Sequence, residues 1–351
     1  MTRIKLLLCS AFALFHFTEI AYGQLDSLLY SEKIYRYRDL MSLKLDATSS
    51  AERFNVNSGN QTTEIRPNAG IVNHIRFNYR LLSFSYKFLV GGLPGNDDAD
   101  TKGESSGTGF GFSFNPGQWA TDFSWSRIKG YYLNNTIDFD PSWQKGDPYL
   151  FFPDLRTSIF RLTVGRAMNK DFSSNAALLQ TERQLFSQGT LLPNIRLTYF
   201  DIDDQIEFTG TNSSQRSKMF ESVFSIGYAH TFTIWKYTYL AADFRPGAGF
   251  LSENLLTRIP QGVFTNSNTY FTYGFTSDIH LGYNGTKFFA GATGSYANYE
   301  HQAPQADNYK VGDERLTWSV FIGIRIKAPE KLKWRFDELE MKIAKKRSER
   351  N

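Results

Sequence analysis

The sequence predicts an all-β fold, an antiparallel transmembrane β-barrel of about 12 strands with a C-terminal periplasmic amphipathic helix. Many segments of roughly ten residues alternate apolar and polar side chains, which is the length and period of a tilted membrane strand. The connections between these segments alternate between long and short, as they do in outer-membrane barrels. Aromatic residues make up 16% of the chain. After the apolar stretch at the amino terminus, no segment is long and apolar enough to be a membrane helix.

The amino terminus predicts a cleaved signal peptide over residues 1–23. Two basic residues precede an apolar stretch from Leu6 to Phe17, which is too short to span a bilayer as a helix. Ala21-Tyr22-Gly23 places small residues at the two positions that a signal peptidase reads, so we expect cleavage before Gln24. Cys9 is the only cysteine, so the mature chain is expected to have no disulfide or thiolate site.

The predicted barrel domain covers residues 24–328 and begins its strands near residue 40. The clearest strand is 271–283, where apolar residues occupy nearly every second position and polar residues the others. The facing of 287–299 is ambiguous, because this segment is rich in small residues. The predicted strands are 40–48, 69–78, 82–91, 109–114, 119–126, 158–166, 194–201, 223–233, 238–248, 271–283, 287–299 and 316–326.

The connections predict which end of each strand faces outward. The long ones are 49–68, 92–105, 133–155, 203–221, 250–268 and 300–314. The short ones are 79–81, 115–118, 234–237 and 284–286. Long loops outside and short turns in the periplasm predict an even strand number and both termini in the periplasm.

One connection does not fit this alternation. Residues 167–192 fall where a short periplasmic turn belongs, and they include the good helix former 176–184. Three alternatives remain open for this segment. It is a periplasmic helix, part of a plug that enters the lumen, or a strand pair that raises the count to fourteen.

Aromatic residues gather beside the connections and predict two interfacial belts. The inner belt is predicted at Tyr79, Trp119, Trp235, Tyr237, Tyr283 and Phe288. The outer belt is predicted at Tyr131, Tyr132, Phe220, Phe250, Tyr270 and Tyr299.

The barrel pattern stops at Pro329, and residues 329–351 predict a basic helical periplasmic tail. Leu332, Phe336, Leu339 and Ile343 share one helical face. Residues 327–351 hold nine Lys or Arg and five Asp or Glu, a difference of four that equals the net charge of +4 for the whole chain. The barrel is therefore nearly neutral, which argues against nucleic-acid binding. A helix packed on the periplasmic rim is favoured over one that binds a membrane surface or a periplasmic partner.

The polar phase of the strands predicts the charged residues of the lumen. The basic ones are Lys44, Arg76, Arg80, Lys87, Arg161, Arg196, Arg245 and Arg325, and the acidic ones are Asp46, Asp122, Asp243 and Asp278. Desolvating unpaired charges costs several kcal/mol each, so a salt-bridged network that fills the lumen is one interpretation. The other is a narrow water-filled pore whose excess of basic side chains favours anions.

The sequence predicts no catalytic residue, metal or cofactor. The mature chain has four histidines, and none has a serine two residues away, so the pattern of a membrane-embedded serine hydrolase is missing. An acidic loop could hold Ca²⁺, but a solvated loop is the simpler interpretation. Its carboxylates are Asp97, Asp98, Asp100 and Glu104.

Three short motifs resemble an uncharacterised outer-membrane barrel family, domain of unknown function 4421, typical of Bacteroidetes-type bacteria. They are Arg66-Pro67-Asn68-Ala69-Gly70, Tyr79-Arg80-Leu81-Leu82-Ser83, and Gln180-Thr181-Glu182-Arg183-Gln184 with Ser187-Gln188-Gly189. The resemblance covers about residues 30–327 and implies a barrel at the outer membrane. It implies no activity and no functional residues. The chain departs from the usual barrel ending, because a tail follows the last strand.

Three function classes follow from these expectations. The first is a narrow passive channel for small, anionic solutes, and the second is a plugged structural or surface-interaction barrel. A lipid-modifying enzyme ranks well behind, because no catalytic cluster lies at the outer rim. The expected partners are outer-membrane lipid, lipopolysaccharide and the barrel-assembly machinery, with a periplasmic partner for the tail as a further option.

Overall fold

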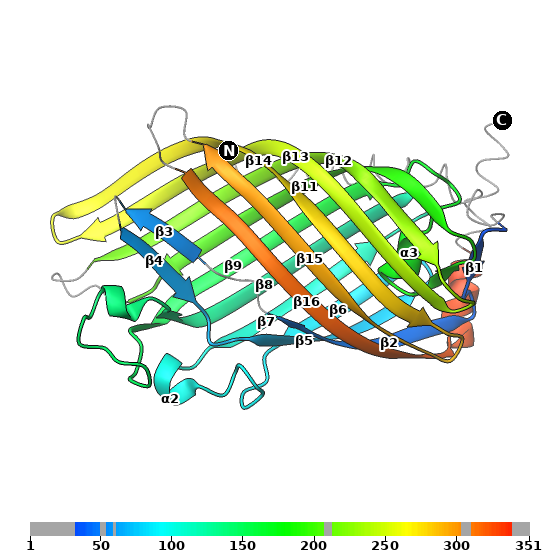
Figure 1. Ribbon diagram of the computed structural model, residues 1–351, viewed down its shortest axis with the longest axis horizontal. Coiled ribbons are helices and arrows are strands. Elements are labelled where there is room, and N and C mark those ends of the chain that lie inside the picture. Colours follow the sequence, from blue (N-terminus) through cyan, green and yellow to red (C-terminus); the bar gives the residue numbers. More distant parts are fainter. Residues whose placement is uncertain (1–31, 50–53, 59–60, 207–212, 303–309, 339–351) are drawn as a thin grey trace.

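The computed structural model describes residues 32–49, 54–58, 61–206, 213–302 and 310–338. The predicted signal peptide and the end of the predicted tail lie outside these residues. In the described part of the chain, twelve antiparallel strands close a barrel (Figure 1) in the order β2-β5-β6-β7-β8-β9-β11-β12-β13-β14-β15-β16, and β16 pairs with β2. The predicted fold and strand number are therefore confirmed, and the alternative of fourteen barrel strands is wrong.

Most of the barrel strands are longer than the alternation predicted, whereas β5 and β6 are shorter. Their bounds are β2 Leu40–Ser49, β5 Ile71–Tyr79, β6 Leu82–Phe88, β7 Ser106–Phe114, β8 Trp119–Leu133, β9 Phe151–Arg166, β11 Gln188–Asp204, β12 Ser214–Thr233, β13 Thr238–Ile259, β14 Gly262–Asn284, β15 Phe288–Gln302 and β16 Lys310–Lys327. One side of the wall, from β2 to β7, is about ten residues tall or less, whereas β12 to β14 reach 20 to 23 residues.

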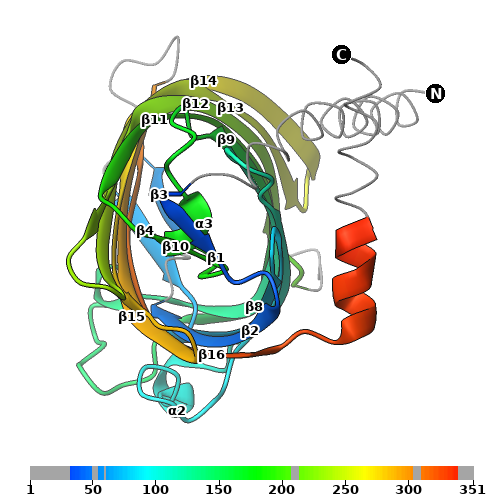
Figure 2. The same cartoon turned by 90° about the vertical axis from the view of Figure 1, so that its right-hand side faces the viewer.

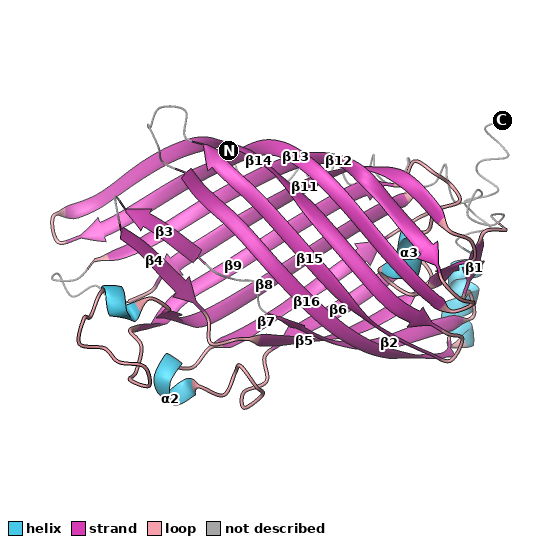
Figure 3. Ribbon diagram, in the orientation of Figure 1, coloured by secondary structure: helices cyan, strands magenta, loops and turns pink. Residues whose placement is uncertain are grey.

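Helices are few and lie at the two ends of the barrel (Figure 3). They are α2 Ala99–Lys102 and the 3-10 helix η2 Thr136–Asp138 in long connections, α3 Ser174–Ala177, and a helix over 330–338. No helix among the described residues is long and apolar enough to cross a membrane.

The outer wall of the barrel is apolar. On β16, Trp318, Val320, Ile322 and Ile324 are all at least half exposed, and they alternate with residues that face inward. Outward-facing large apolar residues continue on most of the other strands, including β12 and β14. A soluble protein does not expose an apolar surface this large, so the wall is built to face lipid hydrocarbon.

We expect a charge on this wall to be costly at mid-membrane depth. Ile322 lies near the middle of the apolar stretch of β16, and Leu316 lies at its outer end, with both side chains exposed. Ile322→Arg should lower the free energy of unfolding in lipid by about 2–4 kcal/mol, and Leu316→Arg by only about 0–1 kcal/mol. Urea titrations of the protein in liposomes measure both. Equal losses at the two positions would contradict the membrane placement.

The long predicted connections contain regular structure. Residues 250–268 are not a loop, because β13 and β14 continue as one hairpin up to the turn between Ile259 and Gly262. Residues 49–68 contain a second hairpin, β3 Phe54–Ser58 with β4 Gln61–Arg66, and β4 adds to β8 through Ile65 and Leu133. Both hairpins lie at the end of the barrel opposite the short turns (Figure 1).

The predicted outer aromatic belt is only partly correct. Phe220 and Phe250 are exposed on the wall as expected. Four others, Tyr131, Tyr132, Tyr270 and Tyr299, are buried. A register shift between Lys129 and Tyr131, at the positive-φ Gly130, changes the phase of β8 at Tyr131. Tyr132 on the other face packs against Tyr149 of an outer connection, with ring centres 5.1 Å apart. In the inner belt, Trp235, Tyr283 and Phe288 are exposed, whereas Tyr79 is buried under the C-terminal helix.

Candidate functional site

The segment 167–192 enters the barrel at the end of the short turns, which is the periplasmic end of outer-membrane barrels. Within it, α3 is followed by β10 Glu182–Gln184, and β10 pairs with β1 Ile34–Arg36 in a separate two-stranded sheet. Viewed along the barrel, α3, β10 and β1 lie inside the ring of strands (Figure 2). Of the three alternatives for this segment, the structure shows the plug.

Internal hydrogen bonds hold the plug in shape. The hydroxyl of Ser173 accepts from the backbone N–H of Ala176 at 3.0 Å, which caps α3. The same hydroxyl donates to Glu182 at 2.6 Å, and Glu182 also accepts from Nε of Arg36 on β1 at 3.0 Å. A helix of one turn has little stability of its own, so these contacts between its cap, β10 and β1 decide its position.

Polar side chains from the barrel wall bind the plug's backbone. Asn284 donates to the carbonyl oxygens of Ala176 and Glu182 at 3.2 and 2.9 Å. Asn78, which is buried, donates to the carbonyl of Leu179 at 3.1 Å. Since buried carbonyl groups need partners, these two asparagines make the wall complementary to one conformation of the plug.

Arg325 joins the plug to the last strand. Its guanidinium donates to the carbonyl oxygens of Gln180 and Gly285 and to the side chain of Asn284. The rings of Tyr37 and Phe289 lie 3.8 and 4.7 Å from its central carbon. Burial raises the pKa of the Tyr37 hydroxyl, and the positive charge of Arg325 opposes that rise.

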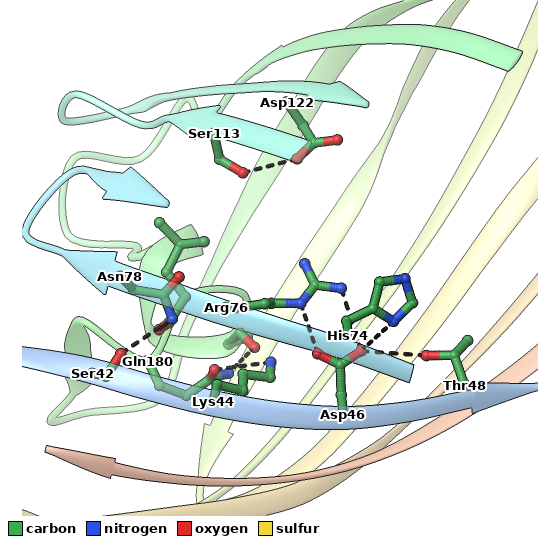
Figure 4. Close-up of polar contacts among 12 residues, drawn as sticks. Ser42, Lys44, Asp46, Thr48, His74, Arg76, Asn78, Ser113, Asp122 and Gln180 are labelled. Atoms are coloured by element: carbon green, nitrogen blue, oxygen red, sulfur yellow. Dashed lines mark hydrogen bonds and ion pairs between the residues drawn. The ribbon is translucent and has the colours of Figure 1, made fainter. Parts of the chain in front are cut away.

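Above the plug, charged side chains of the lumen form ion pairs. Arg76 binds Asp46 at 2.7 Å, and Nδ1 of His74 lies 2.9 Å from the same carboxylate (Figure 4). Lys44 donates to the side chain of Gln180 at 3.1 Å, with its ammonium 4.0 Å from the centre of the Phe321 ring. This cluster therefore connects the plug to the lumen charges.

Two further ion-pair groups lie on the opposite wall. Arg245 contacts Asp243 at 2.6 Å and also pairs with Asp278. Arg196 contacts Glu221 at 3.3 Å and stacks over the ring of Tyr299. Desolvated charges need such partners, so these pairs satisfy much of the charge that the sequence placed in the lumen.

Between these groups lies a lumen cavity of about 490 Å³. Seven of the predicted lumen residues line it: Arg76, Lys87, Asp122, Arg161, Arg196, Arg245 and Asp278. Lys44 and Asp46 are buried beside it, and Asp243 pairs with its lining residue Arg245. Asp122 accepts from Ser113 at 2.8 Å (Figure 4).

The two remaining predicted lumen residues do not line the cavity. Arg325 is in the contact with the plug. Arg80 is not in the lumen, because it forms the turn between β5 and β6 with a φ of 50° and pairs with Asp337 at 2.6 Å. Side chains alternate between the two faces only within a strand, and this alternation ends at the turn. The inward-facing positions of β5 therefore cannot be continued to Arg80.

Sequence reasoning missed several residues of the site. Glu221 was assigned to a loop, because the alternation of β12 is weak before Val223. Arg315 and Tyr299 line the cavity from the ends of predicted strands. The asparagines that bind the plug carried no signal, since a polar residue beside a turn is expected whether or not it binds anything.

The helix over 330–338 packs on the rim at the end of the short turns, outside the barrel (Figure 2). The ring of Phe336 stacks edge-on against Tyr79 at 4.9 Å and contacts Leu81. Lys333 pairs with Asp39 at 2.9 Å, and this hydrogen bond holds the pKa of the Asp39 carboxyl below its usual value. The part of the tail that the structure describes therefore adopts the predicted rim-packed position.

The described residues contain no group of three or more His, Cys, Asp or Glu side chains placed to hold a metal ion. In the acidic loop, Asp98 pairs with Lys102 at 2.5 Å, and Asp97 accepts from the backbone of Gly95. His280 and His301 contact Thr293 and Thr272 within the wall.

A closed barrel with a lipid-facing wall, a charged lumen and an inserted segment at the end of its short turns defines a plugged transmembrane β-barrel of the outer-membrane type. The chain belongs to the family described as Domain of unknown function (DUF4421), whose model matches residues 30–325.

Solved structures similar to this chain include other barrels. The outer membrane protease OmpT from Escherichia coli is 10% identical with a TM-score of 0.37, and the match covers 85% of this chain and 100% of that one. Ail, the attachment invasion locus protein of Yersinia pestis, is 14% identical with a TM-score of 0.23, covering 59% and 97%. Likeness at this level assigns no activity. No curated protein matches the chain.

Proposed function

We propose that this protein is a closed outer-membrane barrel that acts at the cell surface and does not conduct solutes in its resting form. The observation that carries the proposal is the plug, which is held to the wall by Arg325, Asn284 and Asn78. Ion pairs such as Arg245 with Asp278 also bridge neighbouring strands in the lumen. Together they favour the plugged surface barrel over the passive channel.

The surface role rests on the outer end of the barrel. The β13–β14 hairpin carries exposed apolar side chains at its tip, among them Val263 and Phe264. Loops and hairpins that a rigid barrel positions are common places for binding residues. Lipopolysaccharide, outer-membrane lipid and the barrel-assembly machinery remain the proposed partners, and we propose no enzymatic activity.

Planar-bilayer recordings test the proposal directly. The purified full chain, inserted into a bilayer in 1 M KCl, should give no stable current steps above the bare membrane. The buried plug contacts have to break before ions can pass, and each hydrogen bond to a charged group contributes about 1.5–3 kcal/mol. Regular steps of uniform size from the unmodified protein would overturn the closed-barrel proposal and restore the channel.

A further inference from the structure

The wall of the lumen cavity is dominated by cations. Among the described residues that line it, two are carboxylates, Asp122 and Asp278. Six others carry positive charge and come from six different strands: Arg76, Lys87, Arg161, Arg196, Arg245 and Arg315.

For two of these cations, Arg76 and Arg196, the acidic partner lies deeper in the wall than the cation does. The side chain of Asp46 is 4% exposed, whereas that of its partner Arg76 is 32% exposed. Glu221 is 6% exposed and its partner Arg196 is 21% exposed. In these two pairs the carboxylate fixes the position of the guanidinium group, and the cavity meets mainly the guanidinium. Arg245 and Asp278 are equally exposed, at 18% each.

The lining also offers hydrogen-bond donors suited to an anion. Arg196 lines the cavity, and its Nη2 donates to Glu221. A guanidinium presents its donors in a fork that fits phosphate and carboxylate oxygens. Hydroxyl groups of Thr163, Thr276 and Ser225 lie around the same cavity.

We infer that this cavity binds a compact anion that carries two or more negative charges on phosphate or carboxylate oxygens. Cations from opposite sides of one cavity repel each other in a medium of low dielectric, and a multivalent anion between them removes that repulsion. The volume of about 490 Å³ suits a small metabolite, since ligand pockets span about 300–1,000 Å³.

The position of the cavity indicates the side from which the anion enters. Its lining includes Thr48, Ser49 and Val72, which lie at the outer ends of the short strands β2 and β5. The plug contacts Lys44, deeper in the barrel on the same strand. The cavity therefore extends toward the outside of the cell, and the plug lies on its periplasmic side.

Isothermal titration calorimetry on the full chain in a neutral detergent tests this inference. We expect pyrophosphate and citrate to bind in low-salt buffer, and chloride at the same ionic strength to give no binding heat. Tighter binding of pyrophosphate would identify a phosphate ligand, and tighter binding of citrate a carboxylate ligand. No saturable heat with either probe at millimolar concentration would overturn the inference. The heat of binding does not depend on conductance. The anion-binding inference can therefore be wrong while the closed-barrel proposal holds, and the reverse.

A double variant tests the location of the site. Lys87→Gln with Arg161→Gln removes two cavity cations and should weaken binding at least about tenfold, since one charged hydrogen bond is typically sufficient for that factor. The matched control is Arg127→Gln with Lys129→Gln, which removes the same charge from exposed positions on β8. The gel shift on boiling verifies that both variants fold. Equal weakening in the two variants would place binding outside the cavity and contradict the inference.

Discussion

Replacing residues 173–184 with a Gly-Ser linker of the same length should turn a silent barrel into a conducting one. The replaced segment contains α3, β10 and the carbonyl groups that Asn284 and Arg325 hold. A Gly-Ser linker behaves as a flexible coil, so it cannot rebuild these contacts, and water then hydrates Arg325. Bilayer recordings should change from no current steps to regular steps.

The new pore should prefer anions, because Arg and Lys outnumber carboxylates on the cavity lining. The reversal potential in a KCl gradient measures this preference. The matched control replaces residues 137–148, an outer connection of equal length, and should stay silent. If the variant without the plug also stays silent although it is folded, side chains elsewhere in the lumen close the barrel, and the role given to the plug is wrong.

Arg325→Met should lower the free energy of unfolding by at least about 3 kcal/mol. The change leaves the carbonyl oxygens of Gln180 and Gly285 buried without their donor, and hydrogen bonds to a charged group contribute about 1.5–3 kcal/mol each. The flexible methionine keeps much of the packing against Tyr37 and Phe289. Urea titration followed by tryptophan fluorescence measures the loss.

Lys327→Met is the control for this variant, since it removes the same charge two residues further along β16 from an exposed position. We expect a change within about 0.5 kcal/mol for this substitution. A similar loss in both variants would show that charge near the strand end matters, and that the contacts of Arg325 with the plug contribute little.

The alternation in the sequence predicted all twelve barrel strands, because the period of two is a local property that each segment carries within itself. It also predicted the short turns. The helical spacing after Pro329 separately predicted the helix on the rim, of which the structure describes residues 330–338. It predicted strand ends less well, as the continuous β13–β14 hairpin shows. Polar and apolar residues alternate less clearly where a strand leaves the membrane, since neither face there meets lipid.

The charged lumen residues were predicted as a set, and seven of them line the cavity. The sequence could not say which charges pair. Asp46 meets Arg76, which lies 30 positions further along the chain on the neighbouring strand β5. The register between the two strands brings these side chains together, and the sequence does not give that register. Arg80 was misplaced because a turn residue belongs to neither phase of its strand.

Closure of the wall could be inferred from the sequence, since a sheet with one lipid-facing side and polar edges has to curl shut. Whether the ring is open or filled was decided only by the tertiary structure. Arg325 and Gln180 lie 145 positions apart in the chain and meet inside the barrel. No local sequence pattern predicts the contact between Arg325 and Gln180. It forms only after the strands between these two residues have set the width of the lumen.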